Sequence, residues 1–191
     1  MNSFFQFTET APQEYKLSEL AKENQAKSLD YKELDKPISL PFRNSFLPKT
    51  DGEWSGEKGN STWEPNIDKI PEKSNPELLS WGEILKKYGT DGIAFNNGEP
   101  DFSKISSGTV EIAGFSDNRD KNFAKADEAE AKIRGWSPED VEKWRKENHY
   151  TWHESKDCKT MDLVPSVIHN NIPHAGGISE IKKENYNNEV R

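Results

Sequence analysis

The chain has 191 residues, of which 31% are hydrophobic and 31% are charged, and its mean hydropathy is -1.01. So few apolar residues mean that any core is small or confined to part of the chain. The formal net charge of -8 excludes a surface that is basic all round, so contact with a polyanion requires a local basic patch.

The single cysteine, Cys158, excludes an internal disulfide framework and a cysteine-rich zinc site. No stretch approaches the roughly 18 apolar residues of a membrane span. The start of the chain, Met1 to Phe5, lacks the basic flank and long apolar run of a secretory signal. We therefore expect a soluble protein without a membrane span, which stays in the cytoplasm or leaves by a route that needs no signal peptide.

The N-terminal part of the chain has weak structural signals. Leucines and an alanine recur at loose helical spacing over Gln13–Leu34, which predicts one weak, mostly exposed helix. Prolines and glycines interrupt the stretch Pro37–Pro76. We interpret that stretch as a linker that becomes an ordered coil near Trp54 and Trp63, because isolated tryptophans are rarely left unburied.

Regular elements are predicted from Ser80 onward. Ser80 and Glu83 have the spacing of a capping box, and Gly89 is suited to end a short helix. The residues of Ile93–Phe95 and Thr109–Ile112 are typical of short strands. Asn97-Gly98 predicts a turn between the first of these strands and an acidic loop.

Two further helices are predicted before the histidines. The first runs from a Ser116 cap to Arg134, with a buried side formed by Phe123, Ala126 and Ile133. The second begins at Ser137-Pro138, where serine caps and proline suits the first turn, and it packs through Val141 and Trp144.

Three of the four histidines, His153, His169 and His174, fall within 22 residues. The surrounding pattern predicts a strand that ends at His153, a second strand over Met161–Val164 and a short helix entered at Pro165. In such a ββα unit the first histidine can face the other two. His169 and His174 can converge on one ion, and a carboxylate such as Glu154 or Asp162 can complete the ligand set.

These residues resemble the HNH/endonuclease VII superfamily (His-Me finger) nucleases of the Trp-His-His type, which occur at the C-terminus of bacterial polymorphic toxins. The matching elements are Trp152-His153, the stretch Met161–Pro165, His169, and His174 followed by Gly176-Gly177. A weaker similarity extends upstream through Trp81–Gly89, Gly98–Phe102 and Trp144–Asn148. The resemblance covers the chain from about Trp54 to its end.

The resemblance implies an α+β fold: a small ββα-metal nuclease core with preceding helices and short strands, after a poorly structured leader. We place the leader at residues 1–50, the nuclease domain at 51–191 and the core at about 149–178. The resemblance also implies that the protein cleaves DNA with one divalent ion (Mg, Zn, Ni or Mn) and acts in the cytoplasm of a bacterial target cell. It further implies a cognate immunity protein.

One departure affects the catalytic base, because Glu154 stands where the second histidine of the motif is expected. If the base is the histidine nearest the strand end, His153 activates the water. If the base is the following residue, His153 becomes a metal ligand and Glu154 the base. We expect the first arrangement, with the ion held by His169, His174 and Asp162.

Several basic residues are candidates for the local positive surface that the net charge does not supply. They are Arg145, Lys156, Lys159 and Lys182. Two other functions fit the same residues. One is a ribonuclease that uses this site, and the other is a non-enzymatic module in which the histidines hold a structural zinc and the acidic surface binds a protein.

Overall fold

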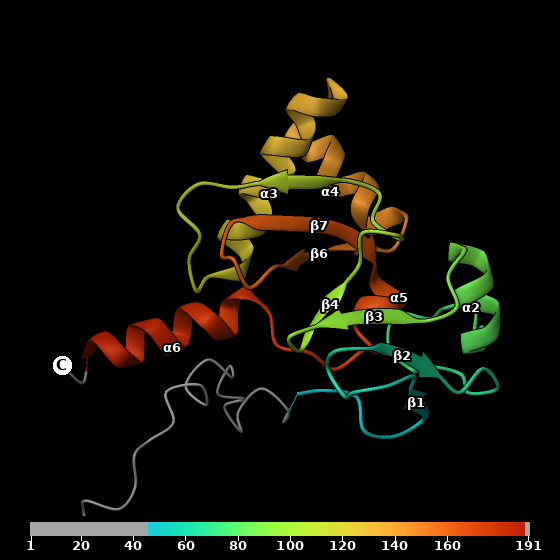
Figure 1. Cartoon of the computed structure of the whole chain (residues 1–191). Coiled ribbons are helices and arrows are strands. Elements are labelled where there is room, and N and C mark those ends of the chain that lie inside the picture. Colours follow the sequence, from blue (N-terminus) through green and yellow to red (C-terminus); the bar gives the residue numbers. More distant parts are fainter. Residues whose placement is uncertain (1–45, 190–191) are drawn as a thin grey trace, which may run out of the picture. The chain divides into compact units, whose positions relative to one another are not determined.

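A computed structural model describes residues 46–189, with side chains to 187. The helix predicted over Gln13–Leu34 and nearly all of the predicted leader lie outside the described residues. Within them the chain forms an α+β fold of two antiparallel sheets and five helices, as predicted (Figure 1). No helix in this range combines the length and the apolar character needed to cross a membrane.

The first sheet has the order β1-β2-β3-β4 and corrects the predicted coil around the two tryptophans. Its strands are β1 (Gly52–Trp54), β2 (Thr62–Pro65), β3 (Ile93–Asn96) and β4 (Glu99–Asp101). Trp54 pairs with Trp63 across β1 and β2, and their ring centroids lie 5.4 Å apart. The cross-strand aromatic pair stabilises a hairpin that the proline and glycine content conceals.

The Asn97-Gly98 turn joins β3 to β4, so the predicted acidic loop is in fact a strand. Both turn residues have positive φ, 50° and 73°, as the tight hairpin turn requires. Phe95 pairs with Pro100 in register, and both are buried. A proline is tolerated here because β4 is the edge strand of the sheet.

Helix α2 (Trp81–Tyr88) has the predicted ends. The hydroxyl of Ser80 accepts from the backbone N–H of Glu83, the Glu83 carboxylate accepts from the backbone N–H of Ser80, and Gly89 closes the helix in a left-handed conformation. Trp81 and Ile84 bury their side chains in the core that covers the first sheet.

Helix α3 (Arg119–Arg134) differs from the prediction at its start and on its buried face. Asn118, not Ser116, caps it. Ala126 is fully buried as predicted, but Ile133 is 70% exposed. The face turned inward carries Asp127 and Glu130, which are buried because each pairs with an arginine.

Helix α4 (Pro138–Glu147) begins with the predicted Ser137 cap and lies against α3. Val141 is fully buried and Trp144 is half-buried. Trp136, just before this helix, is 43% exposed. It lies over the guanidinium of Arg134 at 5.2 Å.

The second sheet has the order β5-β7-β6 and contains the predicted ββα unit. Its elements are β5 (Thr109–Glu111), β6 (Tyr150–Glu154), β7 (Thr160–Pro165) and the short helix α5 (Ser166–His169), after which α6 (Gly177–Glu189) closes the described chain. His153 pairs with Asp162, and Trp152 pairs with Leu163. Side chains alternate along β6, so Trp152 and His153 face opposite sides of the sheet.

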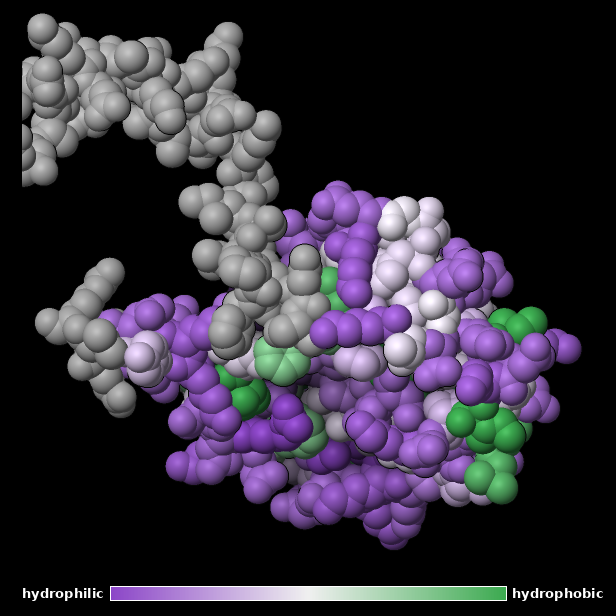
Figure 2. Space-filling view, turned by 90° about the horizontal axis from the view of Figure 1, so that it is seen from below, coloured by the Kyte–Doolittle hydropathy of each residue, from purple (hydrophilic) through white to green (hydrophobic). Residues whose placement is uncertain are grey.

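Two apolar clusters lie on these two sides. One contains Trp152 and Leu163 and packs against α3, and the other contains Val164 and Ile168 and joins the core of the first sheet. On the face shown in Figure 2, hydrophobic residues form small separate spots within a mostly hydrophilic surface. The few apolar residues of the chain are therefore concentrated where the sheets and helices meet, and this rigid frame holds the histidines.

Candidate metal centre

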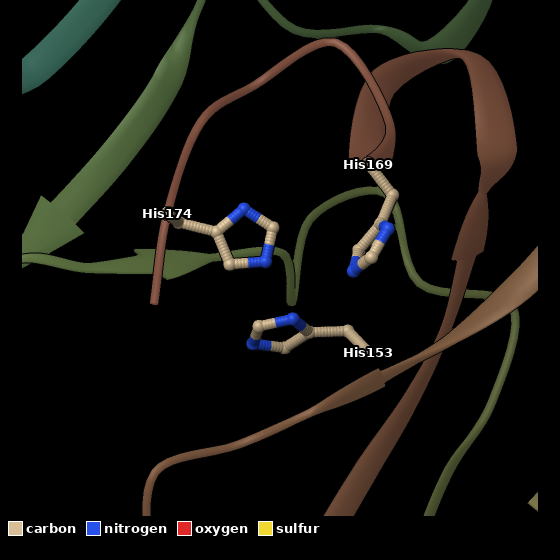
Figure 3. A group of neighbouring side chains, drawn as sticks. All are labelled: His153, His169 and His174. Carbon is tan, nitrogen blue, oxygen red and sulfur yellow. The ribbon is translucent and has the colours of Figure 1, made fainter. Parts of the chain in front are cut away.

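Three imidazoles converge at the edge of the ββα unit, as the sequence predicts. One ring nitrogen from each of His153, His169 and His174 lies within 4.8 Å of the others. His153 comes from β6, His169 ends α5, and His174 lies in the loop before α6. Figure 3 shows the three rings facing one another. Pro173 separates the last two and keeps α5 from continuing, which lets the chain turn back.

His153 is the most enclosed of the three, with 1% of its surface exposed. Neither of its ring nitrogens has a hydrogen-bond partner, although both are buried. Phe102 lies edge-on against the ring at 4.9 Å. Burial, and then the neighbouring His174 and His169, lower the pKa of His153 well below its ordinary value of 6.5, so the ring is neutral at neutral pH.

His169 and His174 each hold Nδ1 against an oxygen. Nδ1 of His174 lies 2.7 Å from the carbonyl oxygen of Ile172, and Nδ1 of His169 lies 3.1 Å from Oδ1 of Asn170. Burial lowers the pKa of His169 to about 3 and also lowers that of His174. Both rings are therefore neutral at neutral pH, the form that binds a metal ion.

The donor set fits a divalent transition ion. An unpartnered polar group in a protein interior costs free energy, and His153 has two such nitrogens beside two other neutral imidazoles. An ion coordinated by one nitrogen from each ring would give these three nitrogens a shared partner. A hollow of about 280 Å³ adjoins the group and is lined by Arg119, Glu154 and the three histidines among others.

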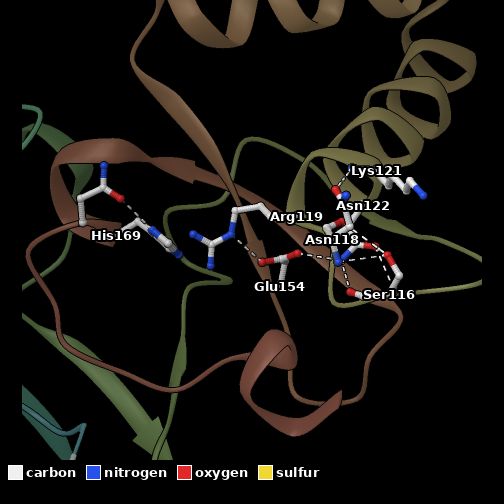
Figure 4. Close-up of polar contacts among 8 residues, drawn as sticks. Ser116, Asn118, Arg119, Lys121, Asn122, Glu154 and His169 are labelled. Carbon is white, nitrogen blue, oxygen red and sulfur yellow. Dashed lines mark hydrogen bonds and ion pairs between the residues drawn. The ribbon is translucent and has the colours of Figure 1, made fainter. Parts of the chain in front are cut away.

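Arg119 and Glu154 form an ion pair beside the histidines (Figure 4). Nε of Arg119 donates to one carboxylate oxygen of Glu154 at 3.0 Å, and the side-chain amide of Asn122 donates to the other at 2.8 Å. Glu154 is 4% exposed, whereas the Arg119 side chain is 61% exposed. The carboxylate is fixed from both sides, and the guanidinium reaches into the hollow.

Sequence reasoning missed Arg119 and Asn122. One signal was available for Arg119, which is the first residue of α3. A cation is disfavoured at the positive end of a helix dipole, so an arginine in that place needs a compensating role. No local pattern marks Asn122, because its partner Glu154 is 32 residues away.

Gly176 allows the loop after His174 to close against β6. A Cβ atom at this position would lie 2.5 Å from the carbonyl oxygen of Glu154 and 3.8 Å from the His153 ring. Only glycine permits that approach without a shift of the backbone. The Gly176-Gly177 pair thus keeps His174 near the other two histidines.

Asp162 does not belong to the group, which corrects its assignment as a metal ligand. It pairs with His153 across the two strands, but its carboxylate accepts a hydrogen bond from the Thr109 hydroxyl at 2.6 Å. It lines a different hollow, together with Asp101 and Asp157. The group of potential ligands found within residues 46–189 consists of the three histidines.

The prediction that Arg145 contacts nucleic acid also needs correction. It is 7% exposed, and two of its guanidinium nitrogens donate to Asp127 at 3.1 and 2.8 Å. It is therefore an internal cation that is not available to a phosphate.

The three predicted lysines lie elsewhere on the surface. Lys182 is exposed on α6, Lys159 pairs with Glu111 at 3.0 Å, and the ammonium of Lys156 donates to the carbonyl of Asn97. None of these three lysines lines the hollow beside the histidines.

Residues 92–176 match the family model of the DNase/tRNase domain of colicin-like bacteriocin. The matched residues begin directly before β3, include Arg119 and the three histidines, and end at Gly176. No curated protein matches the chain. The family match supports a nuclease toxin domain, and such a domain is a hydrolase of phosphodiester bonds.

Proposed function

We propose that residues 51–191 form a metal-dependent endonuclease of the His-Me finger, Trp-His-His type, which hydrolyses DNA as an interbacterial toxin. The observation that carries the proposal is the pair of buried, unpartnered nitrogens of His153 at the meeting point with His169 and His174. Three neutral imidazoles in one place have no evident structural use, because they stabilise little without a shared ion.

In this proposal His153, His169 and His174 are the three protein ligands. Imidazole donors suit zinc or nickel better than magnesium. When bound, the ion polarises a phosphate oxygen and offsets the negative charge of the departing oxygen. Of the two arrangements that the sequence leaves open, the geometry favours His153 as a ligand. Burial lowers its pKa well below the ordinary value, so the ring lacks the basicity of an effective general base.

Glu154 is then the proton acceptor. It follows His153 on β6 and lines the same hollow, where its carboxylate is held by Arg119 and Asn122. Each carboxylate oxygen has a second lone pair, so these two hydrogen bonds leave room for a water molecule. We propose that Glu154 orients the attacking water and takes its proton.

Arg119 binds the scissile phosphate in this arrangement. Its Nε is committed to Glu154, while the exposed end of the guanidinium faces the hollow. A guanidinium offers paired donors to phosphate oxygens, and the helix N-terminus behind it also favours an anion. Arg119 thus couples the position of the phosphate to the position of the base.

A ribonuclease is the second candidate, and the family description, which names DNase and tRNase domains together, favours keeping it. Parallel cleavage of duplex DNA, single strands and transfer RNA by one preparation distinguishes the two. A purely structural zinc site is less well supported, because the hollow beside the histidines leaves open space next to the ion. A producing cell would need a cognate immunity protein for either nuclease.

The direct test is metal removal followed by a plasmid-nicking assay. We expect the chelated protein to lose cleavage and to regain it with zinc or nickel; manganese and magnesium, each added singly, are compared with them. The His169→Ala variant should not regain it. Undiminished nicking by the chelated protein would contradict the proposal, and stable metal binding without cleavage of any nucleic acid would favour the structural site.

A further inference from the structure

The two flanking histidines are held by different kinds of oxygen. His174 donates its Nδ1 proton to the backbone carbonyl of Ile172, which can only accept. Its neutral ring therefore carries the lone pair on Nε2. Within residues 46–189, Nδ1 of His169 has no such backbone partner and faces the side-chain amide of Asn170. The position of its proton depends on which end of that amide it meets.

Ser74 holds the Asn170 amide from the other end. The Asn170 nitrogen donates to the Ser74 hydroxyl at 2.8 Å, which leaves the amide oxygen toward His169 at 3.1 Å. In this orientation His169 donates from Nδ1 and keeps the lone pair of Nε2. A reversed amide would place its N–H groups against Nδ1 and move the ring proton to Nε2.

The loop around Ser74 is fixed to the end of α5. Asn171 accepts from the backbone N–H of Lys73 at 3.1 Å and donates to the Lys73 carbonyl at 2.6 Å. Asn75, 8% exposed, donates to the carbonyls of Pro71 and Leu79. Ser74 itself has a positive φ of 54°, which a non-glycine residue rarely adopts. This ordered loop sets the Ser74 hydroxyl at one place beside Asn170.

We propose that Asn170 acts as a tautomer lock for His169: its amide oxygen, in a side chain that Ser74 helps to hold in place, keeps the proton on Nδ1 and the Nε2 lone pair free for the ion. Asn170 is a positioning residue in this view, and the proposal rests on the proposed metal function. Partners of this kind fix the tautomer and orientation of ligating histidines, and their loss typically weakens metal binding ten- to a hundred-fold.

The test uses three variants of the whole chain. Asn170→Asp keeps an oxygen that can only accept, so it should preserve the His169 tautomer and bind zinc at least as tightly as the original protein. Asn170→Leu removes the acceptor, and Ser74→Ala removes the restraint on the amide. We expect both to mix the tautomers and to weaken zinc binding, Asn170→Leu by about ten- to a hundred-fold. Asn96→Leu, at an exposed position on β3, is the matched control and should change neither property.

Two readouts are independent of nuclease activity. Long-range nitrogen-proton NMR of the histidine rings in the metal-free protein reports the tautomer, and calorimetric titration with zinc reports the affinity. Protonation of His169 at Nε2 in the original protein, or unchanged zinc affinity in Asn170→Leu, would overturn the lock. If the tautomer is as expected but no nucleic acid is cleaved, the lock stands and the proposed nuclease function fails. Should Asn170→Leu not fold, Asn170→Asp and Ser74→Ala still decide the question.

Discussion

Asp127 accepts a hydrogen bond from the indole nitrogen of Trp152 at 2.8 Å, and so ties helix α3 to the residue directly before His153. The same carboxylate is bound by Arg145 of α4 through two guanidinium nitrogens. Both members of the ion pair are buried, Asp127 at 4% exposure and Arg145 at 7%. One carboxylate thus joins two helices and the strand that carries the site.

Removal of Asp127 should therefore be strongly destabilising. Asp127→Ala leaves the Arg145 charge inside the protein without a partner, and we expect it to lower the free energy of unfolding by about 3–5 kcal/mol. Urea denaturation followed by tryptophan fluorescence measures the change. Glu142→Ala, which breaks an exposed pair with Lys146, is the control and should cost less than about 1 kcal/mol. Equal effects of the two variants would contradict a structural role for the buried pair.

Glu154→Gln tests the proposed base. Glutamine has nearly the same size but takes up a proton poorly, so we expect kcat to fall by about a hundred- to ten-thousand-fold. Zinc affinity should change little, because Glu154 is not among the converging ligand atoms. Glu154→Asp, which keeps a carboxylate, should retain more activity than the glutamine variant. Full cleavage by Glu154→Gln would return the role of base to another group, with His153 the first candidate.

Arg119→Ala should weaken both phosphate binding and the placement of Glu154. We expect kcat/KM to fall by about a hundred-fold or more, as happens when one preorganised donor to a developing anion is lost. Arg119→Lys should recover only part of the activity, since lysine cannot offer the paired donors of a guanidinium. Lys121→Ala, two residues along the same helix and exposed, is the matched control. A similar loss in the control would indicate general electrostatic attraction of the substrate.

Gly176→Ala should disturb the metal centre through the backbone. The added methyl group would meet the Glu154 carbonyl at 2.5 Å, so the loop that carries His174 has to move. We expect weaker zinc binding and a loss of about 1–3 kcal/mol in the free energy of unfolding. Gly56→Ala is a suitable comparison, because its Cβ would meet Ser61 at an ordinary distance of 3.4 Å. Unchanged zinc affinity in Gly176→Ala would show that the close approach is not required.

The sequence predicts well those features that depend on neighbouring residues. The cap formed by Ser80 and Glu83, and the one formed by Ser137, use hydrogen bonds that span three residues, so spacing alone reveals them. The ββα unit and the convergence of its histidines are predicted for the same reason, because all three lie within one compact motif.

Features that depend on distant partners are not predictable in this way. Nothing in the spacing of α3 predicts that Asp127 is buried, since a buried carboxylate is recognisable only when its arginine is known. Ile133 lies in the last turn of the same helix, and it faces solvent although Ala126, two turns earlier, is buried. The contact between Asn170 and Ser74 joins residues 96 positions apart, so no local pattern predicts it.

The metal-free protein should lose stability in acid. In the folded chain, burial lowers the pKa of His153 and His174 and lowers that of His169 to about 3, whereas the unfolded values lie near 6.5. As the pH falls below about 6.5 the unfolded chain takes up protons that the folded chain refuses, so each histidine lowers the free energy of unfolding by up to about 1.4 kcal/mol per pH unit. The stability these rings retain is present above about pH 6.5 and is lost progressively toward the folded pKa.

Urea unfolding of the chelated protein between about pH 5 and about pH 8 measures the slope of the free energy of unfolding against pH. His153→Phe should reduce that slope by about one histidine's share, because it removes one group that the fold keeps neutral. An unchanged slope would mean that His153 is not kept neutral by its burial.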